Sequence, residues 1–428
     1  EEGPRDLNPY IHIPGAYYKT AQGSLLKRIP WEPLTGEDNS GHPTMVQARV
    51  LGGGGSVNAM IYIRGVPSDY ERWVASGAKG WGYSDVLPYF KRAEDNNRFC
   101  NDVHGVGGPL GVSDIEYIHP LTRAWLQACQ QAGLPYNPDF NSGDPRGCGL
   151  YQITARNGRR SSAAVAYLNP VRKRRNLRIE TGTTVTRVII EKGRAIGVEC
   201  SRGRRKVVFR ARHEVVVSAG AIASPKLLML SGIGPASQLS RHDIPVHADV
   251  PGVGQNLQDH IEISLVYQLN GPHSYDKYKK LHWKAAAGLN YALFRNGPAA
   301  SNLIEGGAFW CNRDEAEPDI QYFMVVGAGI EEGVDSVPGG NGCTVNLGQI
   351  RPRSRGEVTL LTADPADNPR VAPRYFSDPY DLEAITSGAM AAADIMSQPA
   401  IARFVTSRHT PSPNLNTRAE IRAFCQKD

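Results

Sequence analysis

Four consecutive glycines, Gly52 to Gly55, are the residues whose type and spacing most directly suggest chemistry. They stand in the stretch VLGGGGSVNAMIYIRG, residues 50–65. Without a Cβ atom, glycine main chain can adopt positive φ and can lie against a flat or charged ligand. Both flanks are apolar, which argues against a flexible linker. On this evidence alone the run predicts either a tight loop between buried elements or a loop that offers its main chain to a ligand.

A second stretch, EVVVSAGAIASPKLLMLSGIG (residues 214–234), has the pattern of a strand followed by a helix. Val215–Val217 reads as a short buried strand, and small residues follow it as a turn. Ser224 and Pro225 suit the N-cap and first turn of a helix over 226–230. Doubly wound folds contact dinucleotides with such a unit, although an ordinary strand–helix pair has the same pattern.

The elements that must position these stretches include several helices. Two short ones are predicted within residues 66–100, with Ser68 and Ser84 as N-caps. Residues 120–132 form an amphipathic helix that stops at Gly133. Further helices are predicted over 159–168 and 379–397.

Strand patterns occupy the middle of the chain. From residue 177 to 217 short alternations are separated by turns at Lys192-Gly193 and Arg202-Gly203. Residues 256–350 carry alternating segments such as IEISLVYQL and DIQYFMVV, which suit a separate antiparallel sheet, and 355–362 predicts another strand. We therefore expect an α/β fold, α+β overall, in which a doubly wound domain is interleaved with an antiparallel-sheet domain.

Composition narrows the class of protein. The 428 residues are 41% hydrophobic and 21% charged, with a net charge of +6, which is typical of a globular chain of two or three domains. The basic clusters at 172–175 and 202–212 favour solvated faces over nucleic-acid binding. Seven scattered cysteines indicate neither a disulfide scaffold nor a metal site, so we expect a reducing, cytoplasmic setting. No apolar run reaches the ~18 residues that predict a transmembrane segment.

The two stretches together resemble the two signatures of the glucose–methanol–choline (GMC) oxidoreductase family. The first is matched by ARVLGGGGSVN with the residues that follow it, and the second by GAIASPKLLMLSGIG. Further similar stretches are GWGYSDVLPYFKRAED, RRSSAAVAYLNPV, PGVGQNLQDH and SRGEVTLLTADPADNPRVAPRYFSDPYDLEA, in collinear order over nearly the whole chain.

This resemblance implies a choline-dehydrogenase-like flavoenzyme that carries FAD. The positions that match cofactor-binding positions of the family are Glu1, Arg49, Leu51, Gly52, Gly53, Asn58, Ala59, Met60, Val185, Ala219, Gly220 and Ser224. Glu1 matches the acidic residue that holds the ribose, and Asn58 to Met60 match positions beside the isoalloxazine. Some relatives link FAD covalently through a histidine where this chain has Val57, so we expect non-covalent FAD.

The implied reaction is oxidation of the CH–OH group of a primary alcohol, with hydride transfer to flavin N5. The partners expected are a small-molecule alcohol and an electron acceptor, either oxygen or a quinone or other oxidant. Glu305 matches a position that faces the substrate cavity in choline-using relatives, where it would favour a cationic substrate; a buried, hydrogen-bonded structural carboxylate is the competing interpretation.

The resemblance also implies where the domains and missing parts lie. We expect the FAD-binding domain to comprise residues 1–115 and 151–258, and the substrate domain 116–150 and 259–428. The family's G-x-G-x-x-G turn would precede Glu1, and its catalytic histidine would follow Asp428. His119-Pro120 is assigned no catalytic role. We therefore expect the chain as given to bind little FAD and to be inactive.

Two other functions compete with alcohol oxidation. A non-catalytic fragment or binding protein would hold no flavin after purification. A lyase of the same family, which splits cyanohydrins, would hold flavin that no alcohol reduces. The family spreads many alcohols over one scaffold, so membership fixes neither the substrate nor the acceptor.

Overall fold

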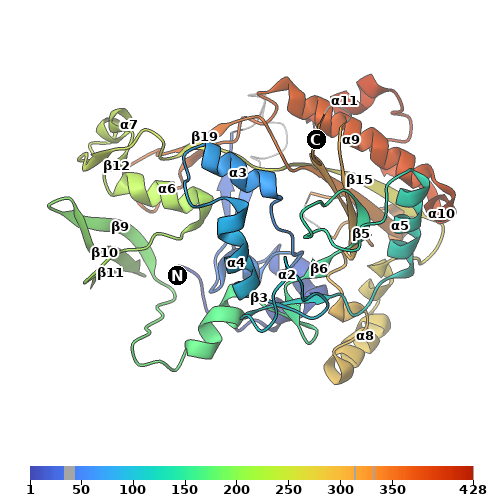
Figure 1. The fold of residues 1–428 in the computed structure, drawn as a ribbon, viewed down its shortest axis with the longest axis horizontal. Coiled ribbons are helices and arrows are strands. Elements are labelled where there is room, and N and C mark those ends of the chain that lie inside the picture. Colours follow the sequence, from blue (N-terminus) through green and yellow to red (C-terminus); the bar gives the residue numbers. More distant parts are fainter. Residues whose placement is uncertain (33–43, 313–314, 331–332, 428) are drawn as a thin grey trace.

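The computed structural model describes residues 1–32, 44–312, 315–330 and 333–427. A large antiparallel sheet lies towards one end of the molecule with helices α5, α9, α10 and α11 around it (Figure 1). A smaller three-stranded sheet, with α6 and α7 nearby, lies towards the other end, and α3 and α4 stand between the two (Figure 1). This arrangement confirms the expected mixture of helices with a separate antiparallel sheet.

The large sheet has six strands in the order β21-β15-β18-β17-β16-β5, and every neighbouring pair is antiparallel. Its strands are β5 (Gly147–Leu150), β15 (Ile261–Leu269), β16 (Gly306–Trp310), β17 (Ile320–Val325), β18 (Gly342–Gln349) and β21 (Val405–Thr410). All eight residues of β18 are buried, because helix α9 (Pro379–Ser397) covers this part of the sheet. Gly388 of α9 permits the close approach, since a Cβ atom there would lie 3.1 Å from Leu347 Cδ1.

The main hydrophobic core lies between this sheet and its helices. It includes Trp125, Tyr322, Leu347 and Ile385, each fully buried. The amphipathic helix predicted at 120–132 is α5 (Pro120–Gln131), whose predicted apolar face is buried in this core. Gly133 follows its C-terminus with φ +92°, a conformation that glycine adopts without strain.

The three-stranded sheet is the predicted β segment of residues 177–217. Strands β9 (Thr184–Glu191), β10 (Arg194–Arg202) and β11 (Arg205–Arg210) pair antiparallel in sequence order. The turns at Lys192-Gly193 and Arg202-Gly203 are confirmed; both glycines have positive φ, as two-residue hairpins require.

The remaining elements are short connections and small sheets. The other helices are α1 (Pro9–His12), α2 (Tyr17–Thr20), α3 (Pro67–Ala75), α4 (Tyr83–Ala93), α6 (Gly220–Leu230), α7 (Ala236–Arg241), α8 (Leu281–Phe294), α10 (Pro399–Ala402) and α11 (Arg418–Lys427). The other strands are β1 (Leu26–Pro30), β2 (Thr44–Ala48), β3 (Glu94–Asn96), β4 (Leu110–Asp114), β6 (Gln152–Ile153), β7 (Ala155–Arg156), β8 (Arg159–Arg160), β12 (Ile233–Gly234), β13 (Ala248–Asp249), β14 (Gln255–Leu257), β19 (Gly356–Thr359) and β20 (Arg370–Ala372). Within the described residues, parallel pairing joins β3 to β4 and β12 to β13.

Several local predictions were wrong. Residues 215–217 are not a strand: within the described ranges no neighbour pairs with them, and Val216 is 76% exposed. The helix predicted from 226 begins earlier, at Gly220, and so encloses Ser224. The segment 159–168 divides into β8 and a short π-helix over Ala164–Leu168.

The predicted N-caps Ser68 and Ser84 are each two residues too late. Val66 and Gly82 occupy the caps, and their main-chain N–H groups donate to the carboxylates of Asp69 (2.8 Å) and Asp85 (3.0 Å). The first-turn carboxylates therefore do the capping that the serines were expected to do. Over the residues described, no helix combines the length and apolar character needed to cross a bilayer.

Candidate functional site

The glycine run forms a tight turn whose members have different roles. Gly52 has φ +93° and Gly53 has φ +57°, and a 3₁₀ turn, η2, covers Gly53–Ser56. A Cβ atom on Gly52 would lie 2.4 Å from Ser56 Oγ, so packing requires glycine there. A Cβ atom on Gly53 or Gly54 would meet nothing within 4 Å. Those two glycines leave bare main chain beside open space, which is what a flat or charged ligand needs.

The main-chain carbonyls of three successive residues after the glycine run, Asn58 to Met60, accept hydrogen bonds from residues far away in the sequence. The donors are Arg160 Nη2 to Asn58 O (2.7 Å), Asn302 Nδ2 to Ala59 O (2.7 Å) and Thr154 N to Met60 O (2.8 Å). The side chain of Asn58 accepts from Met60 N at 3.1 Å and from Arg160 Nη1 at 2.7 Å. Met60 has φ +64°, a conformation that costs a non-glycine residue energy and is kept here by these contacts.

Arg160 is the buried centre of this loop. Its guanidinium donates to the carbonyls of Ile11 (2.7 Å), Gly55 (3.2 Å) and Asn58, and it is 1% exposed. None of the described residues forms an ion pair with it. Burial lowers the pKa of Arg160 to about 10, so the group keeps its positive charge at neutral pH. A buried cation thus lies directly under the loop that the sequence assigns to the cofactor.

A second buried network fixes residues 62–64, which continue from the loop. Arg64 Nη2 donates to Glu94 Oε2 at 2.6 Å, and His104 contacts Glu94 at 2.9 Å and Asp139 at 3.0 Å. Burial by itself lowers the pKa of His104, but hydrogen bonds to Asp139 and Glu94 outweigh burial and raise that pKa to about 9. Asn141 completes the link: its Oδ1 accepts from Arg64 N at 2.8 Å.

A groove of about 440 Å³ brings distant segments together, and its lining ends at Arg49, just before the glycine loop. Four residues that sequence reasoning assigned to the cofactor line it: Glu1, Arg49, Val185 and Ala219. The N-terminal segment is hydrogen-bonded to residues 180–183. Thr183 N donates to Glu1 O at 3.0 Å, and Glu1 N donates to Glu180 O at 3.1 Å. Gly3 lies against the main chain of Arg49, because a Cβ atom on Gly3 would lie 2.2 Å from Arg49 O.

The groove and the glycine loop are joined through residues 47–49. Gln47, Ala48 and Arg49 line the groove, and the loop begins three residues later. Helix α6 begins at Gly220, whose Cβ position lies 3.3 Å from Gln47 Nε2. Ser224 lies one turn inside α6 and does not line the groove; its Oγ accepts from Ala219 N at 3.0 Å.

Two predicted residues turn their side chains away from any open space. Met60 is fully buried with Ile115, Ile153 and Ala155, and Leu51 is 6% exposed. A ligand could therefore meet these positions only through main chain. Val57, which stands where some relatives carry a linking histidine, packs in a small core with Ile11, Leu25 and Val50.

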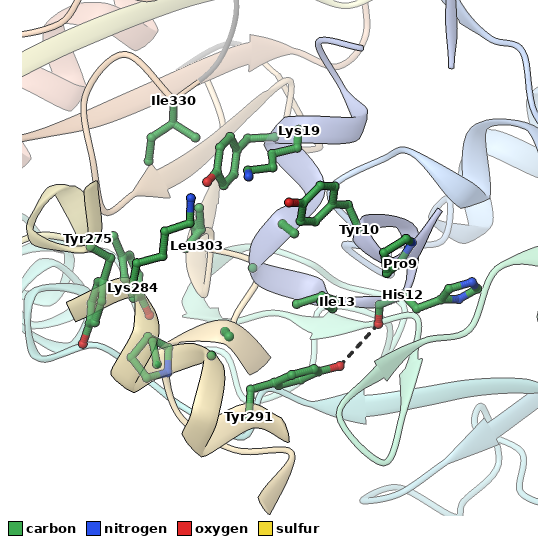
Figure 2. A pocket seen from close by; sticks show the side chains of 18 of the residues that line it. Pro9, Tyr10, His12, Ile13, Lys19, Tyr275, Lys284, Tyr291, Leu303 and Ile330 are labelled. Atoms are coloured by element: carbon green, nitrogen blue, oxygen red, sulfur yellow. Dashed lines mark hydrogen bonds between the residues drawn. The ribbon is translucent and has the colours of Figure 1, made fainter. Parts of the chain in front are cut away.

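A larger cavity of about 950 Å³ is lined by segment 9–19 and by residues within 275–303 (Figure 2). Five tyrosines line it: Tyr10, Tyr18, Tyr275, Tyr278 and Tyr291. Lys19 and Lys284 reach into it from opposite walls, whereas His12 turns its ring away (Figure 2). Lys19 Nζ lies 4.3 Å from the centroid of the Tyr10 ring, so this wall accommodates an ammonium group.

Glu305 is fully buried next to this cavity and accepts four hydrogen bonds. The donors are His119 N (2.9 Å), Thr122 Oγ1 (2.5 Å), Ser301 Oγ (2.6 Å) and Tyr275 Oη. Burial raises the pKa of Glu305, against the hydrogen bonds, which lower it. Tyr275 lines the cavity and Glu305 does not, so Glu305 is linked to the cavity wall only through Tyr275.

His119 starts α5, as predicted, and serves as its cap. Its Nδ1 accepts from Leu121 N at 3.1 Å, and its ring centroid lies 4.9 Å from that of Tyr275. Burial lowers the pKa of His119 to about 4, which keeps the ring neutral and able to accept. Over the described residues, no group of three or more His, Cys, Asp and Glu side chains could hold a metal ion.

The chain is similar to known proteins of one family. A model of GMC oxidoreductases matches residues 21–262, and a C-terminal GMC oxidoreductase model matches 352–428. An oxygen-dependent choline dehydrogenase of Sinorhizobium medicae (strain WSM419) is 38% identical over 431 residues, covering 100% of this chain and 78% of that protein. One of Brucella ovis (strain ATCC 25840 / 63/290 / NCTC 10512) is 37% identical over 434 residues with the same coverage.

The chain belongs to the GMC oxidoreductase family. Among solved structures, pyridoxine 4-oxidase from Mesorbium loti matches with a TM-score of 0.85 and 28% identity, covering 100% of this chain and 80% of that one. Formate oxidase matches with a TM-score of 0.91 at 24% identity, covering 100% and 81%, and this likeness concerns the fold alone.

Membership makes the chain an FAD-dependent oxidoreductase of alcohols, and the expected fold class is confirmed. The residues present fit the cofactor: bare main chain at Gly53 and Gly54, a groove at Glu1 and Val185, and a buried cation under the loop. The comparisons favour neither a binding protein nor a lyase.

Sequence reasoning missed Arg160, Asn302 and the network around His104. Each lies in a stretch without unusual composition, so no pattern marks it. A buried charged residue is recognisable only from the contacts that long-range folding creates. The one available signal was that Arg160 falls in RRSSAAVAYL, a stretch already similar to the family.

Proposed function

We propose that this protein oxidises choline, or a closely related small cationic alcohol, with oxygen as the electron acceptor. The relatives that match over the whole chain are oxygen-dependent choline dehydrogenases, and this supports both substrate and acceptor. The observation that carries the proposal is the buried Glu305 carboxylate bound to Tyr275, at the edge of a cavity lined by tyrosines.

A quaternary ammonium group makes no hydrogen bonds, so its recognition depends on aromatic faces and negative potential. Tyr275 supplies the face, and its hydrogen bond to Glu305 increases the electron density of the ring. The four donors on Glu305 use about all of its lone-pair sites, so the substrate need not contact the carboxylate directly. Of the three lysines that line the cavity, Lys279 is paired with Asp276 at 2.7 Å, whereas Lys19 and Lys284 would have to turn away from a bound cation.

We further propose that FAD is bound non-covalently in the groove and along the glycine loop, by the residues assigned above. When bound, FAD accepts the hydride of the carbinol carbon. The chain's own residues orient it: Glu1 and Val185 hold one end, and the main chain of 52–60 meets the other. Val57 offers no nucleophilic atom for a covalent link. The division into domains at 115, 150 and 258 is part of this proposal.

The test uses the full-length product of the gene, loaded with FAD and mixed anaerobically with choline or with a neutral primary alcohol of similar size. We expect choline to bleach the flavin absorbance, and air to restore it with release of hydrogen peroxide. Replacing Tyr275 with Leu should raise the KM for choline at least about tenfold while the flavin spectrum is retained. Tyr89→Leu, which changes an exposed tyrosine of α4 outside the cavity lining, is the matched control.

Each part of the proposal fails separately. If neutral alcohols bleach the flavin and choline does not, the cationic substrate is wrong. If choline bleaches it and air does not restore it, oxygen is not the acceptor. Flavin that stays with the protein after acid precipitation would contradict non-covalent binding.

A further inference from the structure

Asn302 joins the wall of the 950 Å³ cavity to the loop of residues 58–60. Its neighbour Leu303 lines the cavity, as Tyr275 does (Figure 2). Asn302 does not line the cavity; its Nδ2 donates to Ala59 O at 2.7 Å, although the two residues lie 243 positions apart in the sequence. Asn302 is fully buried, and a hydrogen bond in such surroundings is stronger than one in water. The bond therefore ties the cavity wall to the loop that follows the glycine run.

The segment of residues 301–305 is itself fixed on the side of the cavity. Ser301 Oγ donates to Glu305 Oε1 at 2.6 Å and accepts from Leu303 N at 2.9 Å. Ile304 N donates to Asn302 Oδ1 at 3.2 Å. These partners decide which way the Asn302 amide points, because an N–H group can only donate and a carbonyl can only accept. The oxygen of the amide is used within the segment, and its nitrogen faces the loop.

Each end of this hydrogen bond adjoins a residue in the left-handed region. Met60, next to Ala59, has φ +64°, and Leu303, next to Asn302, has φ +68°. This conformation costs a residue other than glycine energy, and it persists only where the surrounding contacts hold it. Both side chains are buried, Met60 fully and Leu303 with 6% exposed. Loss of the bond between Asn302 and Ala59 would let either main chain relax, and the spacing of the two regions would change.

The main chain of residues 151–154 makes a second connection between the same two regions. Tyr151 N donates to Glu305 O at 2.9 Å, and Thr154 N donates to Met60 O at 2.8 Å. Because these bonds join main chain to main chain, they do not depend on the residue at position 302. They should keep the two regions together when Asn302 is replaced, while the finer spacing is lost.

We propose that Asn302 is a positioning residue, which sets the distance between the alcohol in the cavity and the flavin on the loop. The inference rests on the placement of FAD along this loop, which is part of the proposed function. Hydride transfer needs reacting atoms about 3–3.5 Å apart, and a misplacement of about 1 Å can lower the rate about a hundredfold. Substrate affinity depends instead on Tyr275, whose bond to Glu305 does not involve Asn302. Replacing Asn302 should therefore lower the rate much more than the affinity.

The test uses the full-length gene product loaded with FAD and mixed anaerobically with choline. Asn302→Leu keeps the volume of the side chain and removes its donor. We expect the limiting rate of flavin reduction to fall at least about tenfold, while the choline concentration that gives half of this rate changes less than about threefold. If choline fails to reduce the wild type and a neutral primary alcohol succeeds, the comparison is made with that alcohol, so a wrong substrate remains distinguishable from a wrong role for Asn302.

Asn137 provides the matched control, since its amide is used in the same way elsewhere. Its Nδ2 donates to Asp144 O and Arg146 O, both at 3.0 Å, and its Oδ1 accepts from Asp139 N at 2.9 Å. Asn137 lines neither the cavity nor the groove. Asn137→Leu should leave the limiting rate and the half-saturating concentration within about twofold of the wild type.

Hydrogen exchange gives a readout that needs no turnover. In Asn302→Leu without substrate, the amides of residues 58–62 and of residues 301–305 should both exchange at least about tenfold faster than in the wild type. Asn137→Leu should change neither segment. Asn302→Ala, which removes the same donor and adds no apolar bulk, replaces the leucine variant in both measurements if that variant does not fold.

Four results would overturn the proposal. A wild-type limiting rate in the Asn302 variant would show that the hydrogen bond sets no reactive distance. A rise in the half-saturating concentration alone would make Asn302 a residue that shapes the cavity. An equal loss of rate in Asn137→Leu would trace the effect to general destabilisation. Faster exchange confined to residues 301–305 would mean that Asn302 stiffens its own segment and does not hold the loop.

Discussion

The loop of residues 52–60 and helix α8 differ in how much of the molecule holds each of them in place. The loop is short and irregular, yet side chains and main chain from residues 154, 160 and 302 fix its carbonyls one by one. Helix α8 is regular and satisfies its own main chain, but Tyr291 is its one buried side chain. Tyr291 Oη donates to Gly158 O at 2.9 Å.

This difference shows what each region can do. A loop that must place main chain against a rigid cofactor needs its geometry fixed before the ligand arrives, and the long-range hydrogen bonds supply that order. Helix α8 satisfies its own main chain and buries only Tyr291, so the rest of the molecule holds it less tightly. Substitutions should therefore cost much stability in the first region and almost none in the second.

The largest effect is expected at Arg160. Replacing it with Met removes the donors to the buried carbonyl of Ile11 and to the part-buried carbonyls of Gly55 and Asn58. We expect a loss of about 3–5 kcal/mol in the free energy of unfolding, measured by urea denaturation. The neighbouring Arg159, which is exposed, is the control: Arg159→Met should change stability by less than about 0.5 kcal/mol. Equal effects of the two variants would contradict the role given to the buried guanidinium.

The next largest effect is on the pH dependence of stability, and it concerns the buried network around His104. The pKa of His104 is about 9 in the folded protein, above its ordinary 6.5, so protonation favours the folded state. The stabilisation is complete below about pH 6.5 and is lost as the pH rises through about 9, for a total of up to about 3 kcal/mol. Unfolding free energies measured from pH 6 to 10 should fall across this window. In H104Q the curve should start lower and lack that fall; an unchanged slope would contradict the charged histidine.

A smaller but more specific effect separates two adjacent glycines. Gly52→Ala places a Cβ atom 2.4 Å from Ser56 Oγ at φ +93°, so we expect a loss of about 1–3 kcal/mol in stability. Gly53→Ala places its Cβ atom in open space, so stability should fall by only about 1 kcal/mol. If that space receives FAD, Gly53→Ala should instead weaken FAD binding by the full-length protein about tenfold or more, measured by flavin fluorescence. If Gly52→Ala and Gly53→Ala bind FAD with equal affinity, the open space beside Gly53 is not part of the cofactor site.

The two regions also differ in how far sequence could predict them. The glycine loop was predictable as a tight turn because four consecutive residues without side chains are rare, although residue type alone did not decide whether the turn meets a ligand. The antiparallel sheet and α9 were predictable because their apolar periods are long. The strand expected at 215–217 failed because a short apolar run says nothing about whether a partner strand lies beside it.

Arg160 and α8 could not be predicted for a related reason. Whether an arginine is buried, or whether the leucines of a helix are exposed to solvent, depends on packing against distant segments. An apolar helical period predicts a helix and a buried face together. We expected strands within 256–350 and did not predict α8, and the exposure of its leucines is visible only in the structure.

The smallest expected change in stability tests whether an exposed leucine of α8 contacts other protein. Leu289 is 63% exposed on α8, so replacing it with Gln removes little buried apolar area and should change the free energy of unfolding by less than about 0.5 kcal/mol. Leu265 of β15 is 1% exposed, and Leu265→Ala should cost about 2–5 kcal/mol in the same urea titration. A loss near that of the core variant would mean that Leu289 is packed against protein in solution, and α8 would then belong with the glycine loop as a region held by the rest of the chain.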